Sequence, residues 1–148
     1  MLSDVEIKRR VEERSLVIEP FEPWCLNPAG YDARSIIDLE VKPLSYELIA
    51  TLERFELPLD IVGFIYLRSS LAREGLIGSF AVIDPGFKGN LTLAVFNASK
   101  STIQVKQGER IVQVVFHELT GRASKGYAGK YQDSVGIVPS KRVKSEGA

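Results

Sequence analysis

The sequence predicts one all-β domain with two short helices, and three observations support this fold class. Its β-favouring runs are short and are separated by turns that contain Pro or Gly. The expected strands are 36–41, 47–54, 61–67, 76–83, 91–96, 103–105 and 109–119. Only residues 3–14 carry the start signals of a longer helix. A chain of 148 residues without an internal repeat fits a single domain, residues 1–148, with its own core.

The N-terminal helix is predicted to begin at Ser3 and end at Arg14. Ser3 as N-cap and Glu6 three residues later match a capping box. Ile7 and Val11 provide only a narrow apolar stripe, so the helix is expected to lie on a surface and to be structural.

Residues 15–34 are expected to be irregular, because prolines interrupt the first part and Gly30 favours a turn in the second. Phe21 and Trp24 are expected to plug the edge of a barrel or an interface. Asp32 lies in the predicted turn 27–34, where a turn-stabilising or salt-bridged carboxylate is the simplest interpretation.

The segment after the strand 61–67 combines groups that bind phosphate. Ser69 and Ser70 supply hydroxyls and a preferred helix cap, and Gly75 ends the short helix. Free N–H groups at a helix start, together with Arg68 and Arg73, suit an anionic ligand. The sequence therefore predicts a phosphate cradle over Arg68–Arg73.

A carboxylate follows at the next turn. Asp84-Pro85-Gly86 fits a type II turn that reverses strand 76–83 into strand 91–96. Asp84 is therefore expected at the tip of a hairpin, next to the cradle. Taken singly, Asp84 is explained as a turn former, Phe87 as core and Arg68 with Arg73 as a solvated pair, so only the set of motifs indicates a site.

The last strand is predicted at 109–119, after the turn 106–108. Alternation places Gln113 on the face opposite Val112 and Val114. His117 shares the parity of Gln113, but a surface or interface role is expected for it. From residue 121 onward aliphatic residues are few, so 121–148 is predicted to be a mobile C-terminal arm or lid.

Composition excludes several functional classes. Net charge is zero, which argues against a nucleic-acid partner, and no apolar run approaches the ~20 residues of a membrane span. The charged N-terminus does not resemble a signal peptide, and the single Cys25, expected to be buried, fits a cytoplasmic protein. One Cys and one His cannot form a deaminase zinc site, so any metal is expected to be magnesium arriving with phosphates.

The motifs RSSLAREG (68–75) and AVIDPGFKGN (81–90) resemble the second and third motifs of the trimeric dUTPase and dCTP deaminase superfamily. The resemblance implies a homotrimer of jelly-roll or β-clip barrels with active sites where subunits meet. Residues 27–34 resemble the first motif, which implies that Asp32 lies near the metal as a water-mediated Mg²⁺ ligand. GERIVQVVF resembles the fourth motif, which implies that Gln113 contacts phosphate or metal-bound water.

The resemblance also implies a reaction, the hydrolysis of dUTP to dUMP and pyrophosphate. Asp84 would activate the water that attacks the α-phosphorus, and Phe87 would pack under the deoxyribose. The backbone over Thr92, Leu93 and Ala94 would read the base. Tyr127 and Lys130 of the arm would close on the triphosphate.

The branch of the superfamily follows from one position. A deaminase needs a proton-shuttling glutamate on the strand after the hairpin, and Ala94 occupies that place. The tail GYAGKYQ nevertheless resembles the deaminase arm, with Ser134 where that arm carries a base-reading glutamine. The pattern resembles a dUTPase on a deaminase-type scaffold, as in archaeal enzymes. Two alternatives stay open: a dCTP deaminase or bifunctional enzyme, and a non-catalytic deoxynucleotide-binding trimer.

Overall fold

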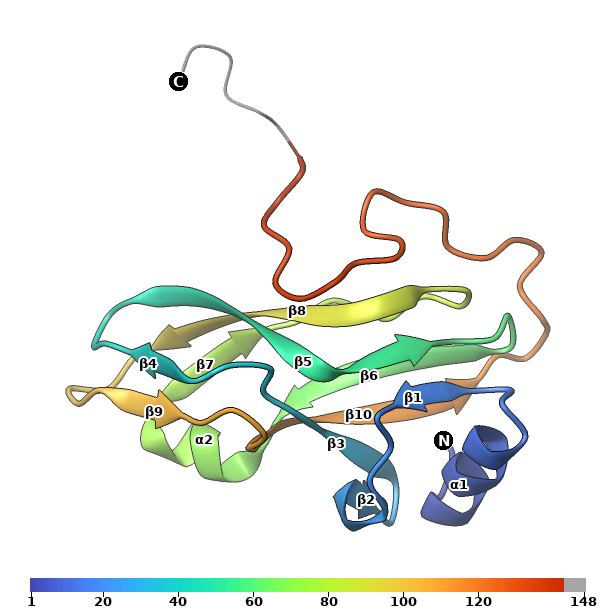
Figure 1. Ribbon diagram of the computed structural model, residues 1–148, viewed down its shortest axis with the longest axis horizontal. Helices are drawn as coiled ribbons and strands as arrows, with labels where there is room; N and C mark the ends of the chain where they lie inside the picture. Colours follow the sequence, from blue (N-terminus) through green and yellow to red (C-terminus); the bar gives the residue numbers. More distant parts are fainter. Residues whose placement is uncertain (143–148) are drawn as a thin grey trace.

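The computed structural model describes residues 1–142, and most of its regular structure is β (Figure 1). Two helices, α1 (Asp4–Glu12) and α2 (Ser69–Glu74), and one 3₁₀ turn, η1 (Pro23–Cys25), accompany the strands. The strands are β1 (Val17–Glu19), β2 (Leu26–Asn27), β3 (Gly30–Arg34), β4 (Leu39–Val41), β5 (Tyr46–Glu56), β6 (Ile61–Leu67), β7 (Leu76–Ser79), β8 (Lys88–Asn97), β9 (Ile103–Val105) and β10 (Arg110–Glu118). The prediction of an all-β fold with two short helices is confirmed.

The strands form two four-stranded sheets and one ribbon, with antiparallel pairing between neighbours. One sheet has the order β1-β5-β8-β7 and the other β2-β3-β10-β6. The pair β4–β9 forms the ribbon at one end of the molecule (Figure 1). Strands β5 and β8 lie over β10 and β3 in this view, and the apolar core fills the space between the sheets.

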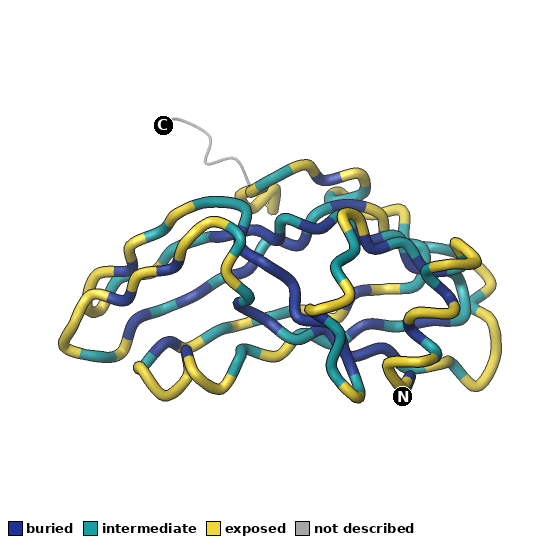
Figure 2. The backbone as a smooth tube through the Cα atoms, turned by 60° about the horizontal axis from the view of Figure 1, so that its bottom comes forward, coloured by how far each residue is buried: buried dark blue, intermediate teal, exposed yellow. Residues whose placement is uncertain are grey.

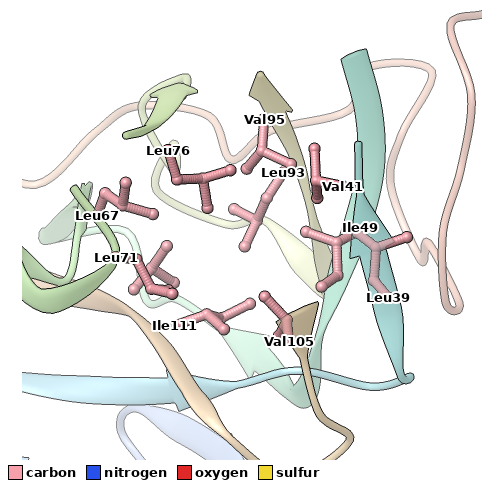
Figure 3. Close-up of a pocket in the computed structure, with 11 residues that line it drawn as sticks. Leu39, Val41, Ile49, Leu67, Leu71, Leu76, Leu93, Val95, Val105 and Ile111 are labelled. Carbon is pink, nitrogen blue, oxygen red and sulfur yellow. The ribbon is translucent and has the colours of Figure 1, made fainter. Parts of the chain in front are cut away.

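Buried residues follow the strands, and exposed residues gather in the loops (Figure 2). At the ribbon end, aliphatic side chains from both sheets and from α2 point toward one another (Figure 3). They enclose a gap of about 10 Å³, room for no more than one water, so this region is packed core. The side chains are Leu39, Val41, Ile49, Leu67, Leu71, Leu76, Leu93, Val95, Val105, Ile111 and Val112.

Two segments expected to be irregular are strands. β1 pairs with β5, and β3 pairs with both β2 and β10. All five residues of β3, Gly-Tyr-Asp-Ala-Arg, are buried, so no alternation marks the strand in the sequence. Tertiary partners for its charged side chains stabilise a strand that local propensity does not favour.

The predicted strand 76–83 is shorter than expected. β7 leaves β8 after Ser79, and Ile83 instead exchanges two backbone hydrogen bonds with Gly63 of β6, at 2.8 and 3.0 Å. A Cβ at Gly63 would lie 2.9 Å from the Ile83 side chain. The glycine therefore permits this close approach of Ile83 to β6.

The two helices begin differently. The Ser3 hydroxyl accepts the Glu6 N–H at 3.3 Å, but the Glu6 carboxylate pairs with Arg9, so only half of the capping box forms. At α2, Arg68 takes the N-cap position instead of a serine, and Gly75 ends the helix with φ +103°. Neither described helix has the length and apolar composition that crossing a bilayer requires.

Candidate functional site

A cavity of about 420 Å³ opens beside the Asp84 turn. Phe87 N–H donates to Asp84 C=O at 3.1 Å and Gly86 has φ +83°, so the predicted turn is confirmed. Asp84 is exposed, and its carboxylate forms no hydrogen bond or ion pair within residues 1–142. Asp84 and Phe87 both line the cavity. The cavity therefore presents an unengaged carboxylate next to an aromatic ring.

The C-terminal arm forms the opposite wall of this cavity and passes over β8 in Figure 1. Tyr127 N–H donates to Pro85 C=O at 2.8 Å, and the Tyr127 ring meets Phe87 edge to face at 5.7 Å. Gln132 donates to Gly86 C=O at 2.9 Å and accepts the Lys88 N–H at 2.8 Å. The arm thus docks on its own Asp84 turn. Its mobility stays a prediction, and residues 143–148 of the predicted arm lie outside the described residues.

The arm also binds along β8. Asn90 N–H donates to Ser134 C=O at 2.9 Å, and Val138 N–H donates to the Thr92 hydroxyl at 3.0 Å. The Ser134 hydroxyl donates to Tyr131 C=O at 2.6 Å within the arm. Ser134 and Thr92 therefore use their side chains to hold the arm in place.

Alternation along β8 separates the three residues expected to read the base. Thr92 and Ala94 lie on the half-exposed face, and Thr92 lines the cavity. The Leu93 side chain points the other way, into the core. Its backbone remains available to a ligand, so base reading by the backbone over these three residues stays a prediction. Ala94 lies opposite Leu48 and Ser79 in the register, and neither supplies a carboxylate.

Two further residues lie on the arm: Lys130, which the sequence predicted as a site residue, and Tyr131, which it did not. The ammonium of Lys130 lies 3.5 Å from Lys141 C=O, on the exposed side of the arm. Tyr131, which the sequence did not single out, lines the cavity. Lys141 N–H donates to its hydroxyl at 3.0 Å, and this hydrogen bond lowers the pKa of Tyr131.

The predicted phosphate-binding residues form a second group, around α2 and β10. Ser69, Ser70 and Arg73 are exposed on α2. Gln113 is half-buried between the buried Val112 and Val114, so the predicted parity is confirmed. Gln113 lies directly opposite Asp32 across the β10–β3 pair. A Cβ at Gly30 would lie 2.7 Å from the Gln113 amide, so Gly30 makes room for this side chain.

Asp32 is a buried ion-pair centre. Its Oδ1 accepts the Asn27 amide at 2.6 Å, and its Oδ2 lies 3.2 Å from Arg68 Nε and 3.6 Å from Arg110 Nη1. The Asp32 side chain is only 4% exposed. Within residues 1–142, no cluster of three or more His, Cys, Asp or Glu is placed to hold a metal. Both carboxylate oxygens are engaged within this chain, and the expected role of Asp32 as a water-mediated Mg²⁺ ligand stays a prediction.

A buried network supports this group from below. Glu53 is fully buried and accepts Arg34 Nε at 2.7 Å, the Arg34 N–H at 2.8 Å and the Tyr31 hydroxyl at 3.3 Å. Burial, and next the Glu53 charge, raise the pKa of Tyr31. Phe21 stacks on Tyr31 at 5.5 Å. Trp24 is 55% exposed, and the guanidinium of Arg34 lies 5.5 Å from the centre of its ring.

Alternation along the predicted strand 109–119 did not identify Arg110 as a residue of this group. A register shift between Arg110 and Val112 inserts a bulge into β10, and the residue between them, Ile111, is buried. Strict alternation would put Arg110 on the face opposite Gln113, but the bulge brings it to Asp32. The only signal in the sequence was its position within GERIVQ.

The single histidine, His117, and the single cysteine, Cys25, have structural surroundings. His117 meets Phe64 edge to face at 5.2 Å, at the surface of the second sheet. Cys25 is buried, and burial raises the pKa of its thiol.

The two groups do not meet within one chain. None of Arg68, Ser69, Ser70, Arg73 and Gln113 lines the cavity beside Asp84. In Figure 1, α2 lies at the lower left, whereas the connection from β7 reaches the start of β8 at the right. The expectation that Asp84 lies next to the cradle is therefore wrong for a single chain.

Comparison with known proteins identifies the family. A family model described as dCTP deaminase-like matches residues 37–119. The dCTP deaminase of Thermococcus kodakarensis is 47% identical over 96% of this chain and 98% of its own length. That of Pyrococcus furiosus is 45% identical over 97% of this chain and 99% of its own length.

Solved structures show the same fold at lower identity. EIAV dUTPase superimposes with a TM-score of 0.61 at 20% identity, over 78% of this chain and 98% of its own. A mutant dUTPase from phage phi11 of S. aureus superimposes with a TM-score of 0.62 at 21% identity, over 74% of this chain and 94% of its own. The chain belongs to the dCTP deaminase-like family, and it shares its fold with these dUTPases.

Proposed function

We propose that this nucleotide-metabolising protein is a dUTP diphosphatase, which hydrolyses dUTP to dUMP and pyrophosphate in the cytoplasm. The observation that carries the proposal is the acidic content of the cavity. Among described residues that line it, Asp84 is the single carboxylate, and it is unengaged. Ala94 stands where the deaminase resemblance requires a glutamate. The cavity thus offers one base, which suffices for hydrolysis.

The chemistry follows from the position of Asp84. Its carboxylate takes a proton from a water as that water's oxygen bonds to the α-phosphorus. The bond from the α-phosphorus to the oxygen that bridges to the β-phosphorus breaks, and pyrophosphate leaves. Phe87 packs under the deoxyribose, and Tyr127 on the arm closes on the triphosphate. The hairpin backbone, including Leu93, reads the base edge beside Thr92 and Ala94.

The phosphates are bound by groups that a neighbouring copy supplies. In a homotrimer, Arg68, Ser69, Ser70, Arg73 and Gln113 of one chain face Asp84 of the next. Hydroxyl and guanidinium donors suit phosphate oxygens, which supports this assignment. Lys130 adds a positive charge on the arm.

Magnesium belongs to this proposal through the substrate, because phosphate oxygens are its preferred ligands. One structural neighbour, the phage phi11 dUTPase, is described with a structural Mg(II) ion. In the present chain Asp32 is engaged by Asn27 and two arginines, so no step is assigned to a metal held by Asp32.

The names of the relatives favour a second candidate, a dCTP deaminase or bifunctional enzyme. Deamination needs a group that shuttles protons to the cytosine ring. The absence of such a group at Ala94 would reduce the rate by roughly 10²–10⁴-fold. Ser134, at the place of the base-reading glutamine, is bonded within the arm and offers no replacement.

Substitution of Asp84 tests the proposal directly. Asp84→Asn keeps the size of the side chain and removes its basicity, so release of pyrophosphate from dUTP should fall by roughly 10²–10⁴-fold. Binding of the non-hydrolysable analogue dUpNHpp and the oligomeric state should be unchanged. Lys8→Gln on α1, an exposed residue away from both groups, is the control. Full activity in Asp84→Asn would remove Asp84 from the mechanism.

A further inference from the structure

We infer that Arg110 is a further phosphate-binding residue, which Asp32 and Trp24 hold in position. The inference rests on the proposed function for the identity of the anion, the triphosphate chain of a nucleotide. Its evidence is independent of that proposal, because it comes from the contacts of Arg110 itself.

The two guanidinium groups beside Asp32 share one carboxylate oxygen. Arg68 Nε lies 3.2 Å and Arg110 Nη1 lies 3.6 Å from Asp32 Oδ2. Arg68 Nη1 also donates to Arg110 C=O at 3.4 Å, and Arg68 N–H donates to Ile111 C=O at 3.0 Å. These contacts bring Arg110 beside the first residue of the proposed phosphate cradle.

The charges of this group are unbalanced in a way that favours an anion. Asp32 supplies one negative charge for Arg68 and Arg110 together. The neighbouring Arg34 does not share that carboxylate, because it has its own buried partner, Glu53, at 2.7 Å. One positive charge is therefore uncompensated within the group, and a phosphate would neutralise it.

Exposure separates the residues that bind from those that position. The Arg68 and Arg110 side chains are 30% and 34% exposed, so a ligand can reach both. Asp32 is 4% exposed and cannot be approached in the same way. The Arg110 guanidinium lies 5.5 Å from the centre of the Trp24 ring, on which a guanidinium stacks favourably. Asp32 and Trp24 therefore restrict Arg110 to an orientation that keeps part of its fork free.

In this arrangement Asp32 positions two arginines, which is a different role from that of a metal ligand. Its carboxylate fixes two arginines at one site, and the Asn27 amide at 2.6 Å fixes the carboxylate in turn. Asp32 is accordingly a positioning residue of the phosphate site.

Trp24 makes the inference testable in the unmodified protein, because it is the only tryptophan in the chain. Inorganic triphosphate bound at Arg110 should change the Trp24 fluorescence saturably, with the same midpoint that calorimetry gives for binding. Deoxyuridine monophosphate should change it much less. Heat of triphosphate binding without any change in fluorescence, or no saturable binding, would overturn the inference.

Variants supply the second part of the test. Arg110→Gln should weaken binding of inorganic triphosphate and of dUpNHpp by about tenfold, as expected for one partly exposed charge-assisted contact. Binding of dUMP should change less than about twofold, and Arg110→Lys should recover part of the loss. Lys8→Gln, which also removes one positive charge, should bind all three ligands like the unmodified protein.

Each remaining outcome decides the question. An equal loss for dUMP and triphosphate in Arg110→Gln, or no loss for either, contradicts phosphate binding by Arg110. If Arg110→Gln does not fold, Arg110→Lys and the Trp24 fluorescence of the unmodified protein decide. Failure of the unmodified protein to hydrolyse dUTP would reject the proposed function alone, since triphosphate binding is measured without turnover.

Discussion

Glu53 offers the sharpest test of how the fold supports the site. Its side chain is fully buried, and it accepts hydrogen bonds from Arg34 Nε, the Arg34 backbone and the Tyr31 hydroxyl. The Arg34 side chain is itself only 9% exposed. Glu53→Gln keeps the shape but leaves a buried guanidinium without a counter-charge. The expected loss in the free energy of unfolding is about 3–5 kcal/mol, a large share of the 5–15 kcal/mol typical of whole domains.

Urea unfolding at pH 7 and fixed protomer concentration measures this loss. Glu53→Gln should shift the midpoint with little change in the slope. The double variant Arg34→Met/Glu53→Leu removes both charges, so it should lose less than Glu53→Gln alone. A loss below about 1 kcal/mol in Glu53→Gln would refute the reasoning, because it would mean that water reaches Arg34.

Two further predictions concern acid stability and the arm. Arg10, which donates to Asp60 at 2.9 Å, lowers the pKa of that carboxyl. The ionised Asp60 carboxylate therefore stabilises the fold above its unfolded pKa of about 3.9, and this stabilisation is lost as pH falls through its lower folded pKa. Urea midpoints of Asp60→Asn and the unmodified protein should differ at pH 7 and converge in strong acid; a gap constant with pH would contradict this. Gly86 has φ +83°, and a Cβ there would lie 2.5 Å from Gly126 Cα, so Gly86→Ala should release the arm. Trypsin should then cut the arm's lysines faster than in Gly121→Ala, where a Cβ meets nothing within 4 Å; equal rates would show that the arm is not held at Gly86.

The sequence predicted those parts of the site that local chemistry determines. Asp84-Pro85-Gly86 forms the expected turn, because Pro and Gly satisfy its backbone angles wherever the turn lies. Gln113 faces outward, because alternation along a regular strand decides its direction. Both predictions needed only neighbours in sequence.

The parts that failed depend on contacts between distant segments. β3 is a strand because Glu53 and Asn27 satisfy its buried Arg34 and Asp32, partners that lie outside the strand itself. The bulge in β10 turns Arg110 toward Asp32, and no residue pattern marks that bulge. Likewise, proximity in sequence suggested that Asp84 adjoins the cradle, but β7 carries the chain away from α2 first.

The most direct test of the account is to incubate the protein and magnesium with dUTP, dCTP, dTTP and UTP in parallel. Pyrophosphate and ammonia are measured in each reaction. The account predicts pyrophosphate and dUMP from dUTP, and no ammonia from dCTP. Ammonia released from dCTP as fast as pyrophosphate from dUTP would contradict it, because deamination would then proceed with alanine at position 94.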